Sequence, residues 1–334
     1  MAPASSASAP LVSRLPAVSP AQRAAFLAMP EDAPPPWDEV PAVDSIEVGG
    51  ATARGIRSSG AIRVAAWNLE RCLYPDESAR ILARSGADLT LLTEMDIGMR
   101  RSGQVHTIGR VAASLGQRYA YGLEFLELDS MPPPAGFASV GSQDTEGFHG
   151  NGLVSALPFE NPVIIRLDPV MDWFCHLPPG QRRKLGARMG IAATFRVGDA
   201  RFVACSVHLE YRCDGAGRAL QMRSLLDALD AYADGLPVIV GGDLNTPTPA
   251  GPPDHPAEPL FATAKSLGYD WLACNAGRPT TRTSVWTPNK GNHQLDWFCT
   301  RGLTARDPLV IPAVAEDGDI LSDHELISVL IDIR

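Results

Sequence analysis

Membrane and secreted proteins are the first classes that the 334-residue sequence disfavours, because the segments that define them are missing. No apolar run approaches the length of about 20 residues that a membrane-spanning helix needs. The amino terminus also lacks the apolar core of a secretory signal, since Leu11 and Val12 are followed at once by Ser13 and Arg14. We therefore expect a cytoplasmic protein.

Cysteines are few and scattered. The six cysteines include no Cys-x-x-Cys pair, which in a chain of this size argues against a disulfide framework and against a zinc knuckle. Cys205 and Cys299 lie inside apolar, strand-like runs, so we expect both to be small buried side chains.

Basic residues are also fewer than acidic residues. The chain has 29 Lys and Arg against 38 Asp and Glu, and its formal net charge of −9 argues mildly against a partner held by phosphate neutralisation alone. A nuclease is still compatible with this charge, because a metal site supplies positive charge locally.

The remaining composition is that of an ordinary globular protein, with 45% hydrophobic and 20% charged residues. Residues 1–60 are rich in Ala, Pro and Ser and predict an amino-terminal arm that is partly disordered or wraps around the body. Residues 61–334 carry no coiled-coil or solenoid repeat and predict one domain.

Apolar runs and helical spacing predict the main elements of that domain. The predicted strands cover residues 62–66, 89–93, 119–125, 153–157, 192–197, 201–208, 238–240 and 326–331. The predicted helices cover residues 76–84, 100–118 and 217–233. In the last helix the expected common face consists of Leu220, Leu225, Leu226 and Leu229.

The stretch 236–246 carries the clearest chemical signal. Its apolar run 238–240 reads as a strand buried on both faces, and two glycines follow it. Asp243 and Asn245 come next, one residue apart, so both face the same side of an extended chain. A carboxylate and a carboxamide at the mouth of a buried strand indicate a site, whereas the simpler alternative is an Asx turn that ends the strand.

Other predicted strands also end in polar residues. The set comprises Asn68, Glu94, His208, Asp243, Asn245, Asp296, Asp323 and His324. It is rich in oxygen ligands, has few nitrogens and has no thiolate, which suits a hard cation such as Mg²⁺ or Mn²⁺. A zinc site would need His and Cys at short fixed spacings, which this sequence lacks.

These residues belong to short motifs in a definite order along the chain. They are Trp67-Asn68, Glu94, Gly150–Ser155, His208-Leu209, Gly242–Asn245, Leu295–Phe298 and Ser322–His324. Over about residues 62–333 the sequence thereby resembles the endonuclease/exonuclease/phosphatase (deoxyribonuclease I-like) superfamily. The resemblance implies an α/β fold, a four-layer α-β-β-α sandwich of two mixed sheets packed face to face with helices outside.

The resemblance also implies a metal site that takes Mg²⁺ or Mn²⁺. Glu94 would be the principal ligand and Asn68 would lie beside it. Asp323 would support a second ion. The metal would act as a Lewis acid on a phosphoryl oxygen and stabilise the leaving oxygen.

Five further residues receive catalytic roles from the resemblance. Asp243 would orient and deprotonate the attacking water, and Asn245 would hold that water or a phosphate oxygen. His324 would donate to the phosphoryl oxygen, and Asp296 would fix the tautomer of that imidazole. His208 would contact the phosphate or the leaving group.

Phosphate binding departs from the family pattern at one position. Many relatives carry Arg after the serine that corresponds to Ser155, whereas this chain has Ala156. Asn151 would add a phosphate donor, and the missing charge would come from Arg188 or from the basic loop 182–184, unless that loop is a solvated turn.

Several other polar residues are expected to be structural. Arg218, Gln221 and Arg223 are interpreted as a polar helix face, and Glu70 and His106 as structural or surface residues. His149 is left open between the rim of the site and a loop.

Together these features predict a metal-dependent phosphoesterase that hydrolyses phosphodiester or phosphomonoester bonds by in-line attack of water. Its substrate would be a nucleic acid or nucleotide, or a small-molecule or lipid phosphodiester, and no obligate protein partner is indicated. The alternative is a catalytically silent scaffold of the same fold that binds a protein or a phosphorylated partner.

Overall fold

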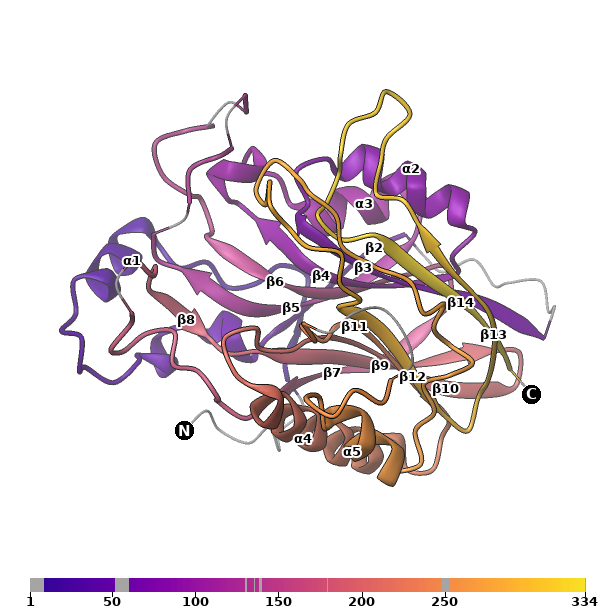
Figure 1. The fold of residues 1–334 in the computed structure, drawn as a ribbon. Helices are drawn as coiled ribbons and strands as arrows, with labels where there is room; N and C mark the ends of the chain where they lie inside the picture. The colour runs from indigo at the N-terminus through magenta and orange to yellow at the C-terminus, as the bar shows by residue number, and fades with distance from the viewer. Residues whose placement is uncertain are drawn as a thin grey trace.

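The computed structural model describes residues 9–51, 60–129, 131–134, 136–137, 140–178, 180–247 and 253–333. Two mixed β-sheets lie face to face, and helices cover the outer side of each (Figure 1). The predicted four-layer α-β-β-α sandwich is therefore confirmed.

The larger sheet has nine strands in the order β1-β2-β5-β6-β4-β3-β14-β13, with β8 paired to β5. Their bounds are β1 Leu11–Val12, β2 Ile46–Gly50, β3 Ala61–Arg71, β4 Leu89–Ile97, β5 Arg118–Glu127, β6 Phe148–Ser155, β8 Lys184–Gly186, β13 Thr304–Ile311 and β14 Leu326–Asp332. The pairs β1–β2 and β3–β4 are parallel and the others are antiparallel.

The smaller sheet has five strands in the order β12-β11-β10-β9-β7. Their bounds are β7 Phe159–Arg166, β9 Met189–Val197, β10 Ala200–His208, β11 Val238–Asp243 and β12 Asp296–Arg301. Only β10 and β11 pair in parallel in this sheet, and the chain crosses between them through a long helix. Every predicted strand is found in one of the two sheets, with bounds shifted by a few residues.

Alternate residues of β3 enter two different apolar cores. Ile62 and Val64 join the layer between the two sheets, whereas Ala65 and Trp67 join the layer under the helices of the larger sheet. A strand that is covered on both faces must be apolar on both, which explains the nearly continuous apolar run that marks this strand in the sequence.

Helices α2 and α3 cover the larger sheet, and α4 and α5 cover the smaller one (Figure 1). The helices are α1 Pro20–Leu27, α2 Pro75–Ser85, α3 Thr107–Leu115, α4 Gly215–Ala233 and α5 Leu260–Ser266, with 3-10 turns at Trp37–Glu39, Pro41–Asp44 and Arg100–Ser102. None of the helices among the described residues combines the length and the apolar character that a membrane crossing requires.

Two details of the predicted helices were wrong. The basic helix expected over residues 100–118 is a 3-10 turn followed by the shorter α3, because Gly103 adopts a left-handed conformation with φ of 70° that ends the first turn. In α4, Leu225, Leu226 and Leu229 are buried, but Leu220 is 51% exposed. Five residues of helix correspond to about 500° of rotation, which places Leu220 well away from the face of Leu225.

Residues 9–51 of the predicted arm wrap onto the larger sheet. Strand β2 pairs with β5, so the sheet already includes an element that precedes the expected domain start at residue 61. The buried Arg23 donates to the main-chain carbonyls of Thr145 and Glu146, which ties α1 to the segment before β6. Residues 1–8 and 52–59 of the arm lie outside the described residues.

The strand register brings polar residues to one edge of the sandwich. Asn68 of β3 is level with Thr93 of β4, the residue before Glu94, and His208 of β10 pairs with Asp243 of β11. Strand β12 starts opposite the end of β11, and β14 runs antiparallel to β3, so its preceding loop lies at the carboxyl end of β3. Both sheets therefore deliver their polar ends to the same region.

Candidate active site

Asn68 joins the two sheets at the centre of this region. Its amide Nδ2 donates to Glu94 Oε1 at 3.1 Å and to Asp243 Oδ2 at 3.0 Å, while its Oδ1 accepts from the main-chain N of Glu70. Asn68 is fully buried, so its hydrogen bonds fix the separation of two carboxylates that come from different sheets.

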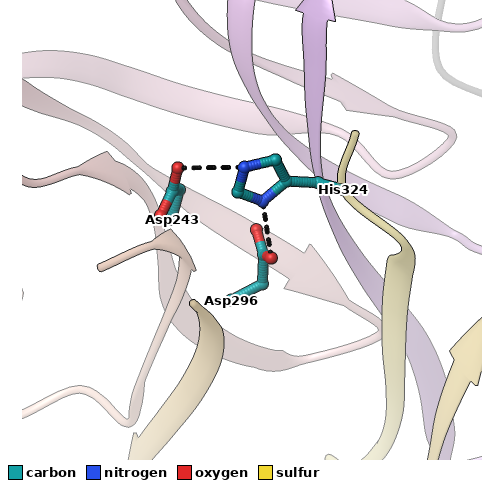
Figure 2. A group of neighbouring side chains, drawn as sticks. All are labelled: Asp243, Asp296 and His324. Atoms are coloured by element: carbon teal, nitrogen blue, oxygen red, sulfur yellow. Dashed lines mark hydrogen bonds and ion pairs between the residues drawn. The ribbon is translucent and has the colours of Figure 1, made fainter. Parts of the chain in front are cut away.

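Asp243, His324 and Asp296 form a row that is joined by one ion pair and one hydrogen bond (Figure 2). His324 Nδ1 lies 2.7 Å from Asp296 Oδ2, and its Nε2 lies 3.6 Å from Asp243 Oδ2. Thr280 Oγ1 also donates to Asp296, at 2.7 Å. The hydrogen bond at Nδ1 orients the ring and turns Nε2 toward Asp243.

The row has strongly perturbed ionisation. Burial disfavours the charged imidazole, but the carboxylates of Asp296, Asp243 and Asp323 outweigh burial and the Lys290 charge and raise the pKa of His324 to about 9. Burial raises the pKa of Asp296, whereas the charges of His324, His208 and Lys290 lower the pKa of Asp243 against its burial. A charged imidazole and an ionised Asp243 therefore coexist at neutral pH.

The backbone around Asp243 shows why two glycines precede it. Gly242 has φ of 147°, and a Cβ there would lie 2.0 Å from the carbonyl oxygen of Val207. Beyond it, the N–H of Asn245 donates to Asp243 Oδ1 at 2.8 Å, and Asn245 Nδ2 donates to the carbonyl of Leu209 at 2.9 Å. The Asx turn expected as the alternative is present, and it fixes a carboxylate whose other oxygen faces His324 and Asn68.

One carboxylate oxygen of Glu94 makes an ion pair but no hydrogen bond. Its Oε2 accepts no hydrogen bond from the described residues, and Arg71 Nη1 stays 3.8 Å away. Burial opposes ionisation, but the charges of Arg71, His149 and His208 hold the pKa of Glu94 well below its usual range. The register of β4 shifts between Leu92 and Met95, and this bulge aims Glu94 into the site.

The donor set around Glu94 fits a hard divalent cation. Glu94 is ionised and its Oε2 accepts no hydrogen bond, as a ligand for such a cation requires. Asn68 turns its Nδ2 toward Glu94 and its Oδ1 toward the N–H of Glu70, so its amide would have to reorient to offer an oxygen to the cation. Asp243, Asp296 and His324 also place one ligand atom each within 4.8 Å of the others. In that second group, however, the His324–Asp296 hydrogen bond already occupies one ring nitrogen.

Glu70 and Asp323 lie beside His324. Glu70 accepts from Ser284 Oγ at 2.6 Å and from the main-chain N of Asp323 at 3.0 Å, and burial together with the Asp323 charge raises its pKa to about 7. The Asp323 carboxylate accepts from Lys290 Nζ at 2.6 Å. Glu70 therefore has a structural role, which is one of the two roles expected from the sequence.

His208 is held in place by three charged groups, Arg188, Glu124 and Asp243. Arg188 Nη1 lies 2.9 Å from His208 Nδ1 and donates to Glu124 Oε1 at 2.9 Å, while Arg188 Nε donates to Glu210 Oε2 at 3.2 Å. On the other side, His208 Nε2 lies 3.6 Å from Asp243 Oδ2. The Arg188 charge overcomes burial and lowers the pKa of Glu124 to about 2.

Asn151 lies on β6 and is fully buried. Its Nδ2 donates to the carbonyl of Met189 at 3.1 Å, and its Oδ1 has no hydrogen-bond partner among the described residues. The structure therefore brings most of the predicted site residues into one connected cluster, comprising Asn68, Glu94, His208, Asp243, Asn245, Asp296, Asp323, His324 and Arg188.

Some outlying residues were predicted incorrectly. Arg218 and Gln221 do not form a solvated helix face, because both are buried: Arg218 binds the Glu258 carboxylate, and Gln221 Oε1 accepts from the N–H of Glu210. His149 is neither in a loop nor on a rim, since it lies buried in β6.

Other outlying residues are as predicted. Arg223 is exposed and pairs with Asp227. His106 is structural, because its Nδ1 accepts the N–H of Gly109 at the start of α3. Cys205 and Cys299 are buried.

Glu124 and Lys290 were missed. A lone carboxylate between Leu123 and Phe125 in an apolar strand is a signal that could have identified Glu124, since a buried charge needs a partner. Lys290 lies in an irregular segment, where no spacing rule indicates its position.

Comparison with known proteins agrees with this geometry. The model of the endonuclease/exonuclease/phosphatase family matches residues 65–324. No curated protein matches the sequence.

Solved structures share the fold at low sequence identity. An endonuclease/exonuclease/phosphatase from Beutenbergia cavernae aligns with a TM-score of 0.57 and 18% identity, covering 82% of this chain and 72% of its own. The human nocturnin catalytic domain with bound sulfate has a TM-score of 0.54 and 18% identity, covering 91% and 100%. A mannosyl-6-phosphatase from Bacteroides thetaiotaomicron has a TM-score of 0.54 and 14% identity, covering 81% and 99%.

Proposed function

Because the chain belongs to the endonuclease/exonuclease/phosphatase family, whose members hydrolyse phosphoester bonds, we propose that it is a divalent-metal-dependent phosphoesterase that uses an activated water. The observation that carries this proposal is the pair of hydrogen bonds by which Asn68 joins Glu94 to Asp243, next to a His324 ring held by Asp296. In this proposal Glu94 is a metal ligand, Asp243 is the base and His324 is the acid, and the three side chains are neighbours.

Glu94 and Asn68 are the proposed ligands of Mg²⁺ or Mn²⁺. Support comes from the ionised Glu94, whose Oε2 accepts no hydrogen bond from the described residues. When bound there, the cation supplies Lewis-acid polarisation of a phosphoryl oxygen and stabilises the leaving oxygen.

Asp243 is the proposed base. It is ionised at neutral pH, its Oδ1 is fixed by the N–H of Asn245, and its Oδ2 faces the site. A water held by Asp243 and by the side chain of Asn245 would attack phosphorus in line with the leaving oxygen, and its proton would pass to Asp243.

His324 is the proposed donor to the phosphoryl oxygen. Its raised pKa favours the protonated ring at neutral pH, and Asp296 holds Nδ1, which leaves Nε2 for the phosphoryl oxygen. Lys290 Nζ lies 2.8 Å from Nε2, and two positive donors this close need a shared acceptor, which the phosphoryl oxygen would supply. A positive donor stabilises the negative charge that develops on phosphoryl oxygen in the transition state.

His208 and Asn151 are proposed to contact the phosphate or the leaving group. Arg188 is almost fully buried and already pairs with Glu124 and Glu210, so we propose that it acts mainly by holding His208. Its positive charge still contributes to the field at the phosphate.

The substrate class stays open between a nucleic acid or nucleotide and a small-molecule or lipid phosphoester. The net charge of −9 favours a small substrate over a long polyanion. The related folds include a mannosyl-6-phosphatase, which is consistent with a small substrate.

Hydrolysis of bis(p-nitrophenyl) phosphate and p-nitrophenyl phosphate, with Mg²⁺ or Mn²⁺ and with chelator, tests the function. We expect turnover that requires the metal and that disappears in Asp243→Asn. A panel of single-stranded DNA, RNA, nucleotides, sugar phosphates and phospholipids then identifies the substrate class. Absence of metal-dependent turnover on every member would favour the silent scaffold.

A further inference from the structure

Lys290 places an ammonium group inside the proposed site. Its Nζ lies 2.6 Å from Asp323 Oδ2 and 2.8 Å from His324 Nε2, and its side chain is 19% exposed. His324 Nε2 is the atom proposed to face the phosphoryl oxygen, so the ammonium group and this nitrogen border the same space.

The loop that carries Lys290 is fixed to the larger sheet. Ser284 Oγ donates to Glu70 at 2.6 Å, and Thr287 Oγ1 donates to the same Asp323 oxygen that binds Lys290, at 3.0 Å. Trp286 of this loop stacks on Arg71, whose guanidinium carbon lies 4.9 Å from the ring centroid. The ammonium position is therefore set by packing on both sides, as a functional charge requires.

These contacts bear on how many metal ions the chain can hold. One Asp323 oxygen accepts from both Lys290 and Thr287, and the other lies 3.7 Å from His324 Nε2. A divalent ion at Asp323 would have to sit against a fixed positive charge in a largely buried place, where the repulsion is poorly screened. Glu94 Oε2 also faces a cation, but Arg71 Nη1 is 3.8 Å away and makes no hydrogen bond to this oxygen.

Resting on the proposed phosphoesterase function, we propose that the Lys290 ammonium group is a built-in second cation. It neutralises Asp323, so the chain binds one divalent ion, at Glu94 and Asn68. It also binds a phosphoryl oxygen of the substrate next to His324, which makes it a phosphate-contacting residue. A lysine suits this role because its ammonium is a compact point charge with three donors.

The metal half of the proposal is tested by calorimetric titration of the full chain with Mn²⁺. We expect one ion per wild-type chain. Asp323→Asn should bind that ion within about threefold of wild type, whereas Glu94→Gln should bind it at least tenfold more weakly. Two ions in the wild-type chain, or a loss in Asp323→Asn as large as in Glu94→Gln, would overturn the proposal while leaving metal-dependent hydrolysis intact.

The phosphate half is tested by titrating inorganic phosphate into the Mg²⁺-loaded protein. Lys290→Met should weaken phosphate binding at least tenfold, Lys290→Arg should restore most of it, and the control Lys265→Met, on the exposed side of α5, should leave it unchanged. Equal phosphate affinity in Lys290→Met and Lys265→Met would overturn this half. A wild-type chain that binds no Mn²⁺ would overturn the metal-dependent function, and this inference with it.

Discussion

Replacing Asp296 by Asn tests the electrostatics of the site without touching the metal ligands. The Asp296 carboxylate is the largest of the influences that raise the pKa of His324, from an ordinary 6.5 to about 9. Asn keeps the size of the side chain but removes the charge. The shift corresponds to about 3 kcal/mol at about 1.4 kcal/mol per pKa unit, which is an upper limit on the stabilisation by the charged imidazole.

Proton linkage determines whether the free energy of unfolding rises or falls with pH. A group whose pKa is higher in the folded state stabilises the fold fully below its unfolded pKa, and this stabilisation disappears as pH rises through the folded pKa. The free energy of unfolding of the wild-type protein should therefore fall between about pH 6.5 and pH 9, by about 2–3 kcal/mol. In Asp296→Asn most of this slope should be lost, because His324 then titrates near or below its ordinary pKa.

Urea denaturation in the presence of chelator, at intervals from pH 6 to pH 9.5, measures this slope directly. Asp199→Asn is a matched control, because Asp199 is exposed in the turn between β9 and β10 and should leave the wild-type slope unchanged. If Asp296→Asn kept the full wild-type slope, Asp296 would not be the group that charges His324. If the wild-type protein showed no such slope, the assignment of His324 as a protonated donor would fail.

Three other substitutions probe separate parts of the site. Asp243→Asn should lower turnover on the order of a thousandfold and keep most of the thermal stability, because Asn retains an oxygen for the Asn245 N–H, as steady-state rates and thermal melts would show; a large stability loss would make Asp243 structural. Glu94→Gln should shift the Mg²⁺ dependence of turnover to higher concentration, and an unchanged Mg²⁺ titration would remove Glu94 from the ligands. Arg188→Met should destabilise the protein by about 3–5 kcal/mol in urea, because it leaves Glu124 and Glu210 buried without their cation; the exposed Arg223→Met is the control, and equal effects of the two would refute the pairing.

The sequence was sufficient to identify those site residues whose position in the fold depends on the local sequence pattern. The end of each buried apolar run marked Asn68, Glu94 and Asp243 as candidates without coordinates. Asp243 does end β11, whereas Asn68 and Glu94 lie inside β3 and β4, where the strand register shifts. The order of the motifs along the chain indicated the family, and the family fold is the sandwich of two sheets that the structure has. Most of the predicted residues fall into the connected cluster for this reason.

Contacts between residues that lie far apart in the sequence could not be predicted from local patterns. Arg218 and Gln221 lie on a helix where polar residues usually meet water, and only the folded chain shows Glu258, 40 positions away, against Arg218. Lys290 reaches Asp323 across 33 positions through an irregular loop. Strand β2 follows a Pro-rich stretch, and its pairing with β5 depends on a partner about 70 residues later.

The backbone at the site explains why the direction of the clustered side chains could not be predicted from the sequence. Adjacent strands β3 and β4 both lose register at the same level, after Asn68 and after Leu92. Glu70, Arg71, Cys72 and Glu94 all have positive φ, a conformation that typically costs about 1–3 kcal/mol for residues other than glycine.

Such strain persists only where surrounding contacts outweigh it. Here Leu69 and Cys72 are buried in the apolar layer, and Glu70 is fixed by Ser284 and by the N–H of Asp323. The loop before β14 and the loop that carries Lys290 therefore hold the kink in β3, and that kink in turn holds Asp323. Metal ligand, ammonium group and His324 are coupled through Glu70, so loosening this one carboxylate should disturb all three together.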